Sequence, residues 1–570
     1  MSGFSPRAAA PTHATDDTRP PSAGAHERPA HERAGHERAG HEHVGHGDTA
    51  HEHAAHGQED EGADVTASPE PAWWRRPFAE QLRTAANGAV LLVVAALVFV
   101  IVRLPWAGDL GVHAATIERL RHDMLDPGNP MVQADTDSPY YSPWMVFLGL
   151  VAKATDLNTF NVLRVGAVIG LALLITGIWS LTRTLTRHRA AAPLAVLCVF
   201  FLWGVDIVAW SGYLGFTSLA LIIAYPSTFT LALGFHFLTL LTKALRGGTA
   251  TGWTAYLSLG LLWAVLMLSH QFSGVVITLG AIGVLASARP WPAKGTWFKL
   301  LGAVAVGLAV LALWPYYSFF SLFGIGGLEE IHQNLYRGLL ARYCLVLIGV
   351  VALVLRFVRN RRDPLVIWFA LGLTLVVAGA LTEKWSWGRA EPAVVIPAQI
   401  AAAIAAVECG KKWLRAVFAT AVSIGLVAGA WAQRDALGFI MREEALPSFA
   451  TKGGLLELPK TYEWTKKYAK YGDVFMSDPF AAQKLPAYGY YTIAIGYPDF
   501  FLPDEAERRM DARRYFTNDT TREEKLAILH KYGADWIVQW PQQGGLPAND
   551  PALKKAGMSP DGRVLYKVVG

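Results

Sequence analysis

Charged residues are scarce in this 570-residue chain. Asp, Glu, Lys and Arg together make up 17% of the sequence, against 52% hydrophobic residues. Mean hydropathy is positive, at +0.26. A soluble chain of this length would normally form several domains, each with a larger charged surface. The composition therefore excludes an ordinary soluble protein and predicts a polytopic membrane protein embedded in a lipid bilayer.

Cysteine is almost absent, and the net charge is small. The three cysteines, Cys198, Cys344 and Cys409, lie in or beside apolar segments, so they form neither a disulfide framework nor a CxxC metal site. The formal charge of +5 is spread over the whole chain, and the basic residues are confined to particular loops. Nucleic acid is therefore not an expected partner.

Residues 1–86 have almost no large apolar side chains and carry 10 of the 17 histidines in a degenerate repeat. Such a segment buries too little surface to offset its ordering entropy, so we expect a disordered, His-rich cytoplasmic tail. Pairs such as His41 with His43 can chelate a transition metal weakly, but a low-complexity tail is the simpler interpretation. The segment has no apolar core or cleavage site typical of a signal peptide.

Residues 87–432 contain repeated apolar runs near the length that crosses a bilayer. A shorter run at 142–155 follows the sequence SPYYSPW and is interpreted as an interfacial helix. We expect eleven spans, at 87–105, 161–182, 191–209, 226–242, 253–269, 272–288, 299–316, 338–355, 365–382, 391–408 and 414–432.

The basic residues test this count. With Arg75 and Arg76 in the cytoplasm, alternate loops carry groups such as Arg183 with Arg187 and Arg189, while the intervening loops 210–225, 270–271 and 317–336 contain no Lys or Arg. This is the distribution that the positive-inside rule requires, and counting 142–155 as a span would invert it. The expected location is the plasma membrane, with multiple passes.

An odd number of spans places residues 433–570 on the side opposite the amino terminus. The stretches GDVFMSDP, YYTIAIGY, GADWIVQW and GRVLYKVV are typical of short strands, and 459–471 and 520–532 have helical spacing. We therefore predict an extracytoplasmic α/β domain after a membrane domain at 87–432.

Polar residues gather at the outer ends of the spans, which makes them candidates for function. The first outer loop, 106–160, is the richest. Asp109 and His113 lie one helical turn apart, as a general base and its orienting partner would, although Asp109 also fits an ordinary helix cap. The loop TEKWSWGRAE places Lys384 and Arg389 outside against the positive-inside rule, which indicates an anionic partner or, alternatively, a local ion pair with Glu383 or Glu391.

The long acidic first outer loop, the YYSPW entry to a short helix, the repeated spans and the carboxy-terminal α/β domain together resemble the GT-C superfamily of integral membrane glycosyltransferases. The segment from KYAKYGDVFMSDP to LHKYGADWIVQWP is similar to the periplasmic end of bacterial members, including arabinofuranosyltransferases.

This resemblance implies inverting transfer of a sugar from a polyprenyl-phosphate carrier to a glycan acceptor, with Asp109 as general base. Arg389 and Lys384 would bind the donor phosphate, with Arg337 and His270 as second choices. No cofactor is assigned, and a divalent cation at the DTD sequence is left open. The candidates for the acceptor or a metal ion are Asp135, Asp137, Glu118, Tyr140 and Tyr141.

Two other classes of protein stay open. A transporter or lipid flippase also needs many spans, but it generally gathers its polar groups near the membrane midplane, often within repeated halves. Here the middles of spans such as 253–269 and 365–382 are nearly free of ionisable groups. An inactive scaffold that presents its outer domain to partners is the third alternative.

Overall fold

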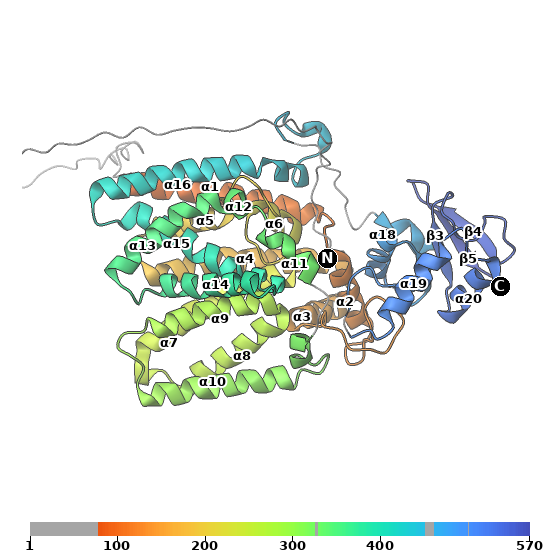
Figure 1. Ribbon diagram of the computed structural model, residues 1–570, viewed down its shortest axis with the longest axis horizontal. Coiled ribbons are helices and arrows are strands. Elements are labelled where there is room, and N and C mark those ends of the chain that lie inside the picture. The colour runs from red at the N-terminus through yellow and green to blue at the C-terminus, as the bar shows by residue number, and fades with distance from the viewer. Residues whose placement is uncertain (1–77, 325–328, 451–460, 500, 570) are drawn as a thin grey trace, which may run out of the picture. The chain divides into compact units, whose positions relative to one another are not determined.

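The computed structural model describes residues 78–570 except 325–328, 451–460, 500 and 570. It is mostly helical and ends in a small sheet (Figure 1). The His-rich part of the expected tail lies outside the described residues. The first helix, α1 (Phe78–Arg103), starts before the expected span at 87, because the polar segment FAEQLRTAANG is rich in good helix formers that continue the apolar helix outward.

Each expected span coincides with a helix. Among the described residues, eight helical segments are long and apolar enough to cross a membrane, which makes the chain a multi-pass membrane protein. The other three, α5, α8 and α9, are apolar but shorter, so the count of eleven is not reached by length alone. The helix α5 ends at Phe201 rather than near 209 as expected. Beyond its end, the backbone N–H of Val205 donates to the carbonyl of Ala341 at 2.8 Å.

The short run after SPYYSPW forms α3, a helix of 13 residues capped by the hydroxyl of Ser142. It packs against α2, α4 and α8. The helical segments up to the last span are α1, α2 (Leu110–His122), α3 (Pro143–Thr155), α4 (Thr159–Leu185), α5 (Ala191–Phe201), α6 (Phe216–Ile222), α7 (Pro226–Gly247), η2 (Gly248–Ala250), α8 (Trp253–Ser269), α9 (Gln271–Ala286), α10 (Lys294–Ala312), η3 (Phe320–Gly324), α11 (Glu329–Gln333), η4 (Asn334–Tyr336), α12 (Leu339–Tyr343), η5 (Cys344–Val346), α13 (Leu347–Arg359), α14 (Pro364–Leu381), η6 (Trp385–Ala390), α15 (Pro392–Glu408) and α16 (Lys412–Ala432).

The helix α15 is the most buried of these spans. It packs against α5, α13, α14 and α16. Its alanine-rich sequence lets neighbouring backbones approach closely: a Cβ atom at Gly349 of α13 would lie 2.1 Å from the carbonyl oxygen of Ala398. By contrast, α1 leaves Leu91, Leu92 and Phe99 exposed, as expected for a helix that faces lipid.

The carboxy-terminal part forms a five-stranded sheet in the order β2-β1-β3-β5-β4. The strand β1 pairs in parallel with β2 and β3, whereas β5 pairs antiparallel with β3 and β4. The four expected strands correspond to β1, β2, β3 and β5. The described elements here are η7 (Arg434–Phe439), η8 (Glu443–Ala445), η9 (Glu463–Lys467), β1 (Val474–Ser477), α18 (Pro479–Ala482), η10 (Leu485–Tyr488), β2 (Tyr491–Thr492), α19 (Glu505–Tyr515), α20 (Arg522–Lys531), β3 (Trp536–Gln539), β4 (Leu553–Met558) and β5 (Val564–Val568).

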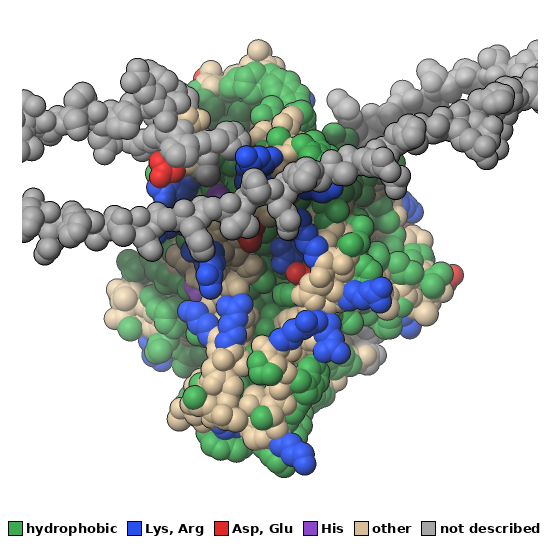
Figure 2. All heavy atoms as spheres, turned by 90° about the vertical axis from the view of Figure 1, so that its left-hand side faces the viewer, with side chains coloured by type: hydrophobic (Ala, Val, Ile, Leu, Met, Phe, Trp, Pro, Cys, Tyr) green, Lys and Arg blue, Asp and Glu red, His purple; other side chains and the backbone are tan. Residues whose placement is uncertain are grey.

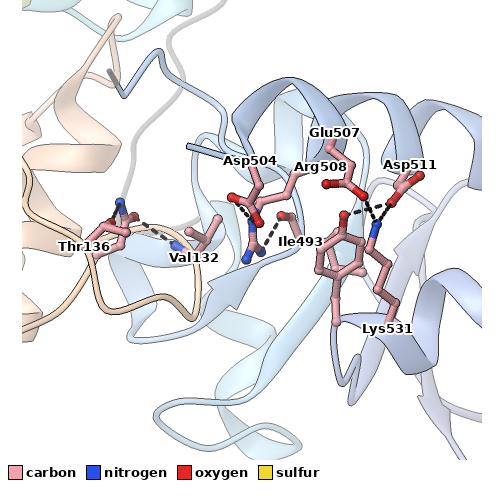
Figure 3. A network of polar contacts seen from close by, with 10 residues as sticks. Val132, Thr136, Ile493, Asp504, Glu507, Arg508, Asp511 and Lys531 are labelled. Atoms are coloured by element: carbon pink, nitrogen blue, oxygen red, sulfur yellow. Dashed lines mark hydrogen bonds and ion pairs between the residues drawn. The ribbon is translucent and has the colours of Figure 1, made fainter. Parts of the chain in front are cut away.

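Ion pairs hold α19, which the sequence does not predict, against its neighbours (Figure 3). Arg508 pairs with Asp504 at 2.9 Å and donates to the carbonyl of Ile493 at 3.3 Å. Lys531 of α20 contacts Glu507 at 2.5 Å and Asp511 at 2.7 Å. The helix therefore depends on charge pairing more than on an apolar stripe.

The helix α2 of the first outer loop packs directly on this carboxy-terminal part. Arg119 is fully buried and donates to the carbonyls of Gly489 at 3.1 Å and Tyr490 at 2.5 Å. A Cβ atom at Gly111 would lie 2.0 Å from the carbonyl oxygen of Gln483. The two segments are more than 350 residues apart in sequence, yet they share one packed interface.

Candidate active site

A cavity of about 360 Å³ opens where α1 leads into α2. Its wall combines the turn before α2, the stretch from the loop between α5 and α6 through α6 to the start of α7, and the segment around α18. The lining residues are Trp106, Ala107, Gly108, Asp109, Ala209, Trp210, Ser211, Leu221, Ile222, Tyr225, Pro479, Phe480, Gln483 and Tyr497. Three separate parts of the chain thus build one site.

Asp109 is the only carboxylate among the residues that line this cavity. It occupies the N-cap position of α2, but its side chain accepts no capping hydrogen bond. It is 7% exposed, and burial raises the pKa of its carboxyl group, while the charge of Arg389 opposes that rise. A carboxylate that does not cap its helix and has a raised pKa is suited to accept a proton.

The turn that presents Asp109 is fixed from both sides. Gly108 has a φ of +43°, a conformation that other residues rarely adopt. The hydroxyl of Tyr497 donates to the carbonyl of Gly108 at 2.6 Å, and the hydroxyl of Tyr225 donates to the carbonyl of Ala107. Both tyrosines line the cavity, so the residues that shape the site also position its carboxylate.

Arg389 lies behind the same wall and is 3% exposed. Its Nη2 donates to the carbonyl of Ser211 at 2.9 Å, and its guanidinium lies over the rings of Phe272 and Trp210 at 4.5 and 5.6 Å. Its Nη1 is 3.4 Å from Nε2 of His332. The expected alternative of an ion pair with Glu383 or Glu391 is not recorded among the described residues. Glu391 instead accepts hydrogen bonds from Tyr213 at 2.5 Å and from Tyr343.

His270 joins this cluster from the turn between α8 and α9. The backbone N–H of Ser273 donates to its Nδ1 at 3.2 Å, so Nε2 carries the proton of the neutral ring and donates to Oγ of Ser211 at 3.3 Å. Burial, together with the charge of Arg389, keeps the pKa of His270 well below its ordinary value. The ring is therefore a neutral donor near Ser211.

His113 lies close to Asp109 in sequence but points to aromatic neighbours. Its ring packs edge-on against Tyr225 and Tyr140, at centroid distances of 4.8 and 6.0 Å. Burial lowers its pKa to about 3. Within the described part of the chain, no hydrogen bond joins its imidazole to the Asp109 carboxylate. The two residues are joined instead by a helical hydrogen bond from the backbone N–H of His113 to the C=O of Asp109, at 3.2 Å.

Other expected site residues lie apart from the cavity. Lys384 and Arg337 are exposed, as are Asp135 and Asp137. The described residues contain no group of three His, Cys, Asp or Glu side chains arranged to hold a metal ion. Glu118 accepts a hydrogen bond from Thr159, and Tyr141 donates to the carbonyl of Gly128 at 2.8 Å. The structure thus brings together Asp109, Arg389 and His270, with Tyr140 and His113 beside them.

The carboxy-terminal residues Phe480, Gln483 and Tyr497, which line the cavity, are not predicted from the sequence to belong to the site. Behind Phe480 lies Lys484, which is fully buried, has no hydrogen-bond partner among the described residues and contacts the rings of Trp106 and Phe480. Burial lowers the pKa of Lys484 to about 7. The sequence around these residues does not mark them as functional. They reach the site only because their segment packs on α2.

Comparison with solved structures finds proteins of similar fold. The arabinofuranosyltransferase AftD from Mycobacteria superimposes over 85% of this chain with a TM-score of 0.51 and 13% sequence identity. A mutant form of that protein gives a TM-score of 0.52 at 14% identity. The present chain spans about 40% of the length of AftD.

An oligosaccharyltransferase from Archaeoglobus fulgidus superimposes over 87% of this chain and 75% of its own, at 13% identity, but its TM-score of 0.45 is too low to carry an argument. No protein-family model matches the chain, and no curated protein matches it in sequence. The likeness to AftD thus confirms the expected fold class, a polytopic helical membrane protein with a carboxy-terminal α/β part.

Proposed function

We propose that this protein is a membrane glycosyltransferase that moves a sugar from a polyprenyl-phosphate carrier to a glycan acceptor at the outer face of the plasma membrane. One observation carries the proposal: Asp109 lines a cavity whose wall also contains Trp210 and Ser211, two of the residues that the buried Arg389 contacts. The proposed proton acceptor thus lies in the cavity, and the proposed phosphate-binding cation lies behind its wall. The likeness to AftD in fold supports this class of reaction.

In the reaction, the acceptor hydroxyl attacks the anomeric carbon of the sugar. Its oxygen forms the new glycosidic bond, and its proton passes to the Asp109 carboxylate. The bond between the anomeric carbon and the phosphate oxygen breaks, and the polyprenyl phosphate leaves with the bonding electrons. Direct displacement of this kind inverts the anomeric configuration.

The leaving phosphate gains negative charge as this bond breaks. Arg389 supplies a guanidinium that suits a phosphate. Nε2 of His270, which like Arg389 contacts Ser211, supplies a neutral hydrogen-bond donor. Because Arg389 is held by Ser211 and His332 before any ligand arrives, little reorganisation is needed in the transition state. Lys384 and Arg337 are exposed in this structure, so we assign them a lesser part in holding the donor.

The acceptor requires a different surface from the donor phosphate, one that is apolar and aromatic with few charges. Trp106, Phe480 and Tyr497 provide such a surface along the cavity, and Gln483 adds an amide for hydroxyl groups. Asp135, Asp137, Glu118, Tyr140 and Tyr141 belong to the same outer loop and remain candidates for a longer acceptor or a cation.

The orientation in the membrane follows from charge. Figure 2 shows Lys and Arg side chains gathered on the face at the end of the bundle away from the carboxy-terminal sheet. By the positive-inside rule this face is cytoplasmic, which puts Asp109 and the sheet outside.

Native mass spectrometry of the protein purified in mild detergent tests the proposal. We expect wild-type protein to carry polyprenyl phosphate or its glycosylated form, Arg389→Ala to lose it, and Lys384→Ala to retain most of it. The mass of the attached lipid identifies the class of sugar. Bulk phospholipid alone on all three proteins, together with lipid movement across proteoliposome membranes, would favour the flippase alternative instead.

A further inference from the structure

A second polar cavity lies at the other end of the bundle from Asp109. It has a volume of about 300 Å³ and is lined by Arg83, Asn87, Trp179, Arg183 and Arg189. Arg83 and Asn87 come from the first turns of α1, and Trp179 and Arg183 from the last turns of α4. Arg189 lies just before α5. We call this cavity the arginine groove; none of the residues expected from the sequence to act on donor or acceptor lies in it.

The groove contains three guanidinium groups and no carboxylate among its lining residues. Arg183 donates to the carbonyl of Arg187 at 2.8 Å, whereas Arg83 and Arg189 have no recorded partner in the described part of the chain. At the same end of the bundle, by contrast, Arg356 forms an ion pair with Asp363 at 2.7 Å. Three cations converging without a counterion favour a bound anion.

Asn87 adds a second, independent indication. Its Oδ1 is buried but accepts no hydrogen bond from any described residue. Leaving a buried amide oxygen without a donor destabilises a protein, so such atoms usually meet a partner in the functional state. The missing group is therefore a hydrogen-bond donor, such as a hydroxyl, located close to the anion.

The groove sits where a lipid headgroup would lie. It is built by the ends of two helices that are long and apolar enough to span the membrane. Trp179 lines it, and tryptophan prefers the boundary between headgroups and acyl chains. Farther along α1, Leu91 and Leu92 are 69% and 74% exposed, so an acyl chain has an apolar surface to follow.

We propose that the arginine groove binds the headgroup of an anionic phospholipid that carries a free hydroxyl, such as phosphatidylglycerol. Arg83, Arg183 and Arg189 bind the phosphate, and the headgroup hydroxyl donates to Oδ1 of Asn87. Basic pockets between membrane helices are known to favour anionic headgroups. The bound lipid joins α1 to α4, the two helices that lead into and away from the loop carrying Asp109. This inference does not depend on the proposed function.

Native mass spectrometry with added lipid tests the site. Wild-type protein, an Arg83→Ala/Arg189→Ala variant and an Arg361→Ala/Arg362→Ala control are each titrated with phosphatidylglycerol and phosphatidylcholine. Arg361 and Arg362 are exposed and lie outside the groove, at the α13–α14 turn on the same basic end of the bundle. We expect the preference of wild type for phosphatidylglycerol to be at least tenfold, to fall at least fivefold in the groove variant and to persist in the control.

An equal preference in wild type and in the groove variant would overturn the proposal. So would loss of the preference in the control, because the effect would then come from the general charge of that face. A further titration adds inorganic phosphate to the lipid-bound protein. If phosphate displaces the lipid at millimolar concentration, the site binds free phosphate rather than a membrane lipid, and the assignment is wrong.

Asn87→Leu keeps the test decisive if the double variant folds poorly. Because leucine preserves the volume but cannot accept a hydrogen bond, we expect it to weaken phosphatidylglycerol binding about fivefold. Phosphatidic acid, which has the phosphate but no glycerol hydroxyl, should bind equally to wild type and Asn87→Leu. Equal effects on both lipids would contradict the role given to Asn87.

Discussion

The two ends of the helix bundle treat charge in opposite ways. Around the Asp109 cavity, ionisable side chains are buried: Arg389 is 3% exposed and His332 is fully buried. At the other end, arginines such as Arg183 and Arg189 are exposed. Figure 2 shows Lys and Arg side chains gathered on the face at that end. Burying an ionised group costs several kcal/mol, whereas exposing one costs little. The first end therefore carries the groups to which we assign the chemistry, and the second carries those to which we assign the orientation and the proposed lipid site.

The largest expected effect comes from Asp109. Asp109→Asn keeps the shape of the side chain but cannot accept the acceptor proton, so we expect turnover to fall about 10²–10⁴-fold. The measurement is transfer of a labelled sugar from a polyprenyl-phosphate donor by protein in nanodiscs, with lipid retention followed by native mass spectrometry. Asp519→Asn, an exposed and unpaired control, should have no effect. Full turnover by Asp109→Asn would remove this residue from the mechanism.

Arg389 gives the next effect. Arg389→Lys keeps a positive charge but loses the paired contacts with Ser211 and His332, so we expect a loss of about 10²–10³-fold in kcat/KM for the same reaction. Arg337→Ala and Lys384→Ala should each cost less than about threefold, because both side chains are exposed. A loss of kcat/KM in Arg337→Ala or Lys384→Ala as large as that in Arg389→Lys would contradict the contrast between buried and exposed charge.

Asp499 tests how the carboxy-terminal part is held on the outer loop. It is fully buried and accepts hydrogen bonds from Asn129 at 3.0 Å, Ser138 at 3.1 Å and the backbone of Phe501 at 3.2 Å. Asp499→Ala leaves these donors unpaired, so we expect a loss of roughly 1–3 kcal/mol of stability. A lower Tm and faster proteolysis near residue 499 would report it. An unchanged Tm would show that the hydrogen bonds of Asp499 are not needed to hold this interface.

The smallest expected effect is a pH dependence from Lys484. Its pKa is about 7 in the folded protein and 10.5 ordinarily, so the unfolded state binds more protons between these values. Stability should therefore rise as the pH increases from about 7 towards 10. Lys484→Met should remove this slope and add roughly 1 kcal/mol near pH 7, since it replaces a buried charge with an apolar chain. Thermal unfolding from pH 6 to 9 measures both, and parallel curves for the two proteins would contradict the assignment.

Much of the fold could be predicted because hydropathy and basic residues report directly on the membrane. Each expected span coincides with a helix, and four strands lie where the apolar stretches occur. The elements that were missed have weak local signals. The strand β4, LKKAGM, is largely polar and exposed at the sheet edge, and α19, EAERRMDARRY, has no apolar stripe. Both depend on a partner in the next element of the chain: β4 pairs with β5, and α19 forms ion pairs with Lys531 of α20.

The candidate site could be predicted less completely. Asp109 was found from its position after the first span, and Arg389 from a basic residue on the unexpected side of the membrane. The sequence could not separate Arg389 from Lys384, because both lie in one short loop and only the turn of η6 buries the former. Phe480, Gln483 and Tyr497 were missed because their role depends on the docking of distant segments.

The close approach of Gly111 to Gln483 has a consequence for how the protein is made. Asp109 is synthesised early, whereas Phe480, Gln483 and Tyr497 follow about 370 to 390 residues later. Until that segment reaches α2, the cavity lacks one wall and Arg119 lacks the carbonyls that it binds. A nascent or truncated chain therefore has the carboxylate without the pocket. The complete cavity therefore exists only after the last domain has been made and has packed on α2.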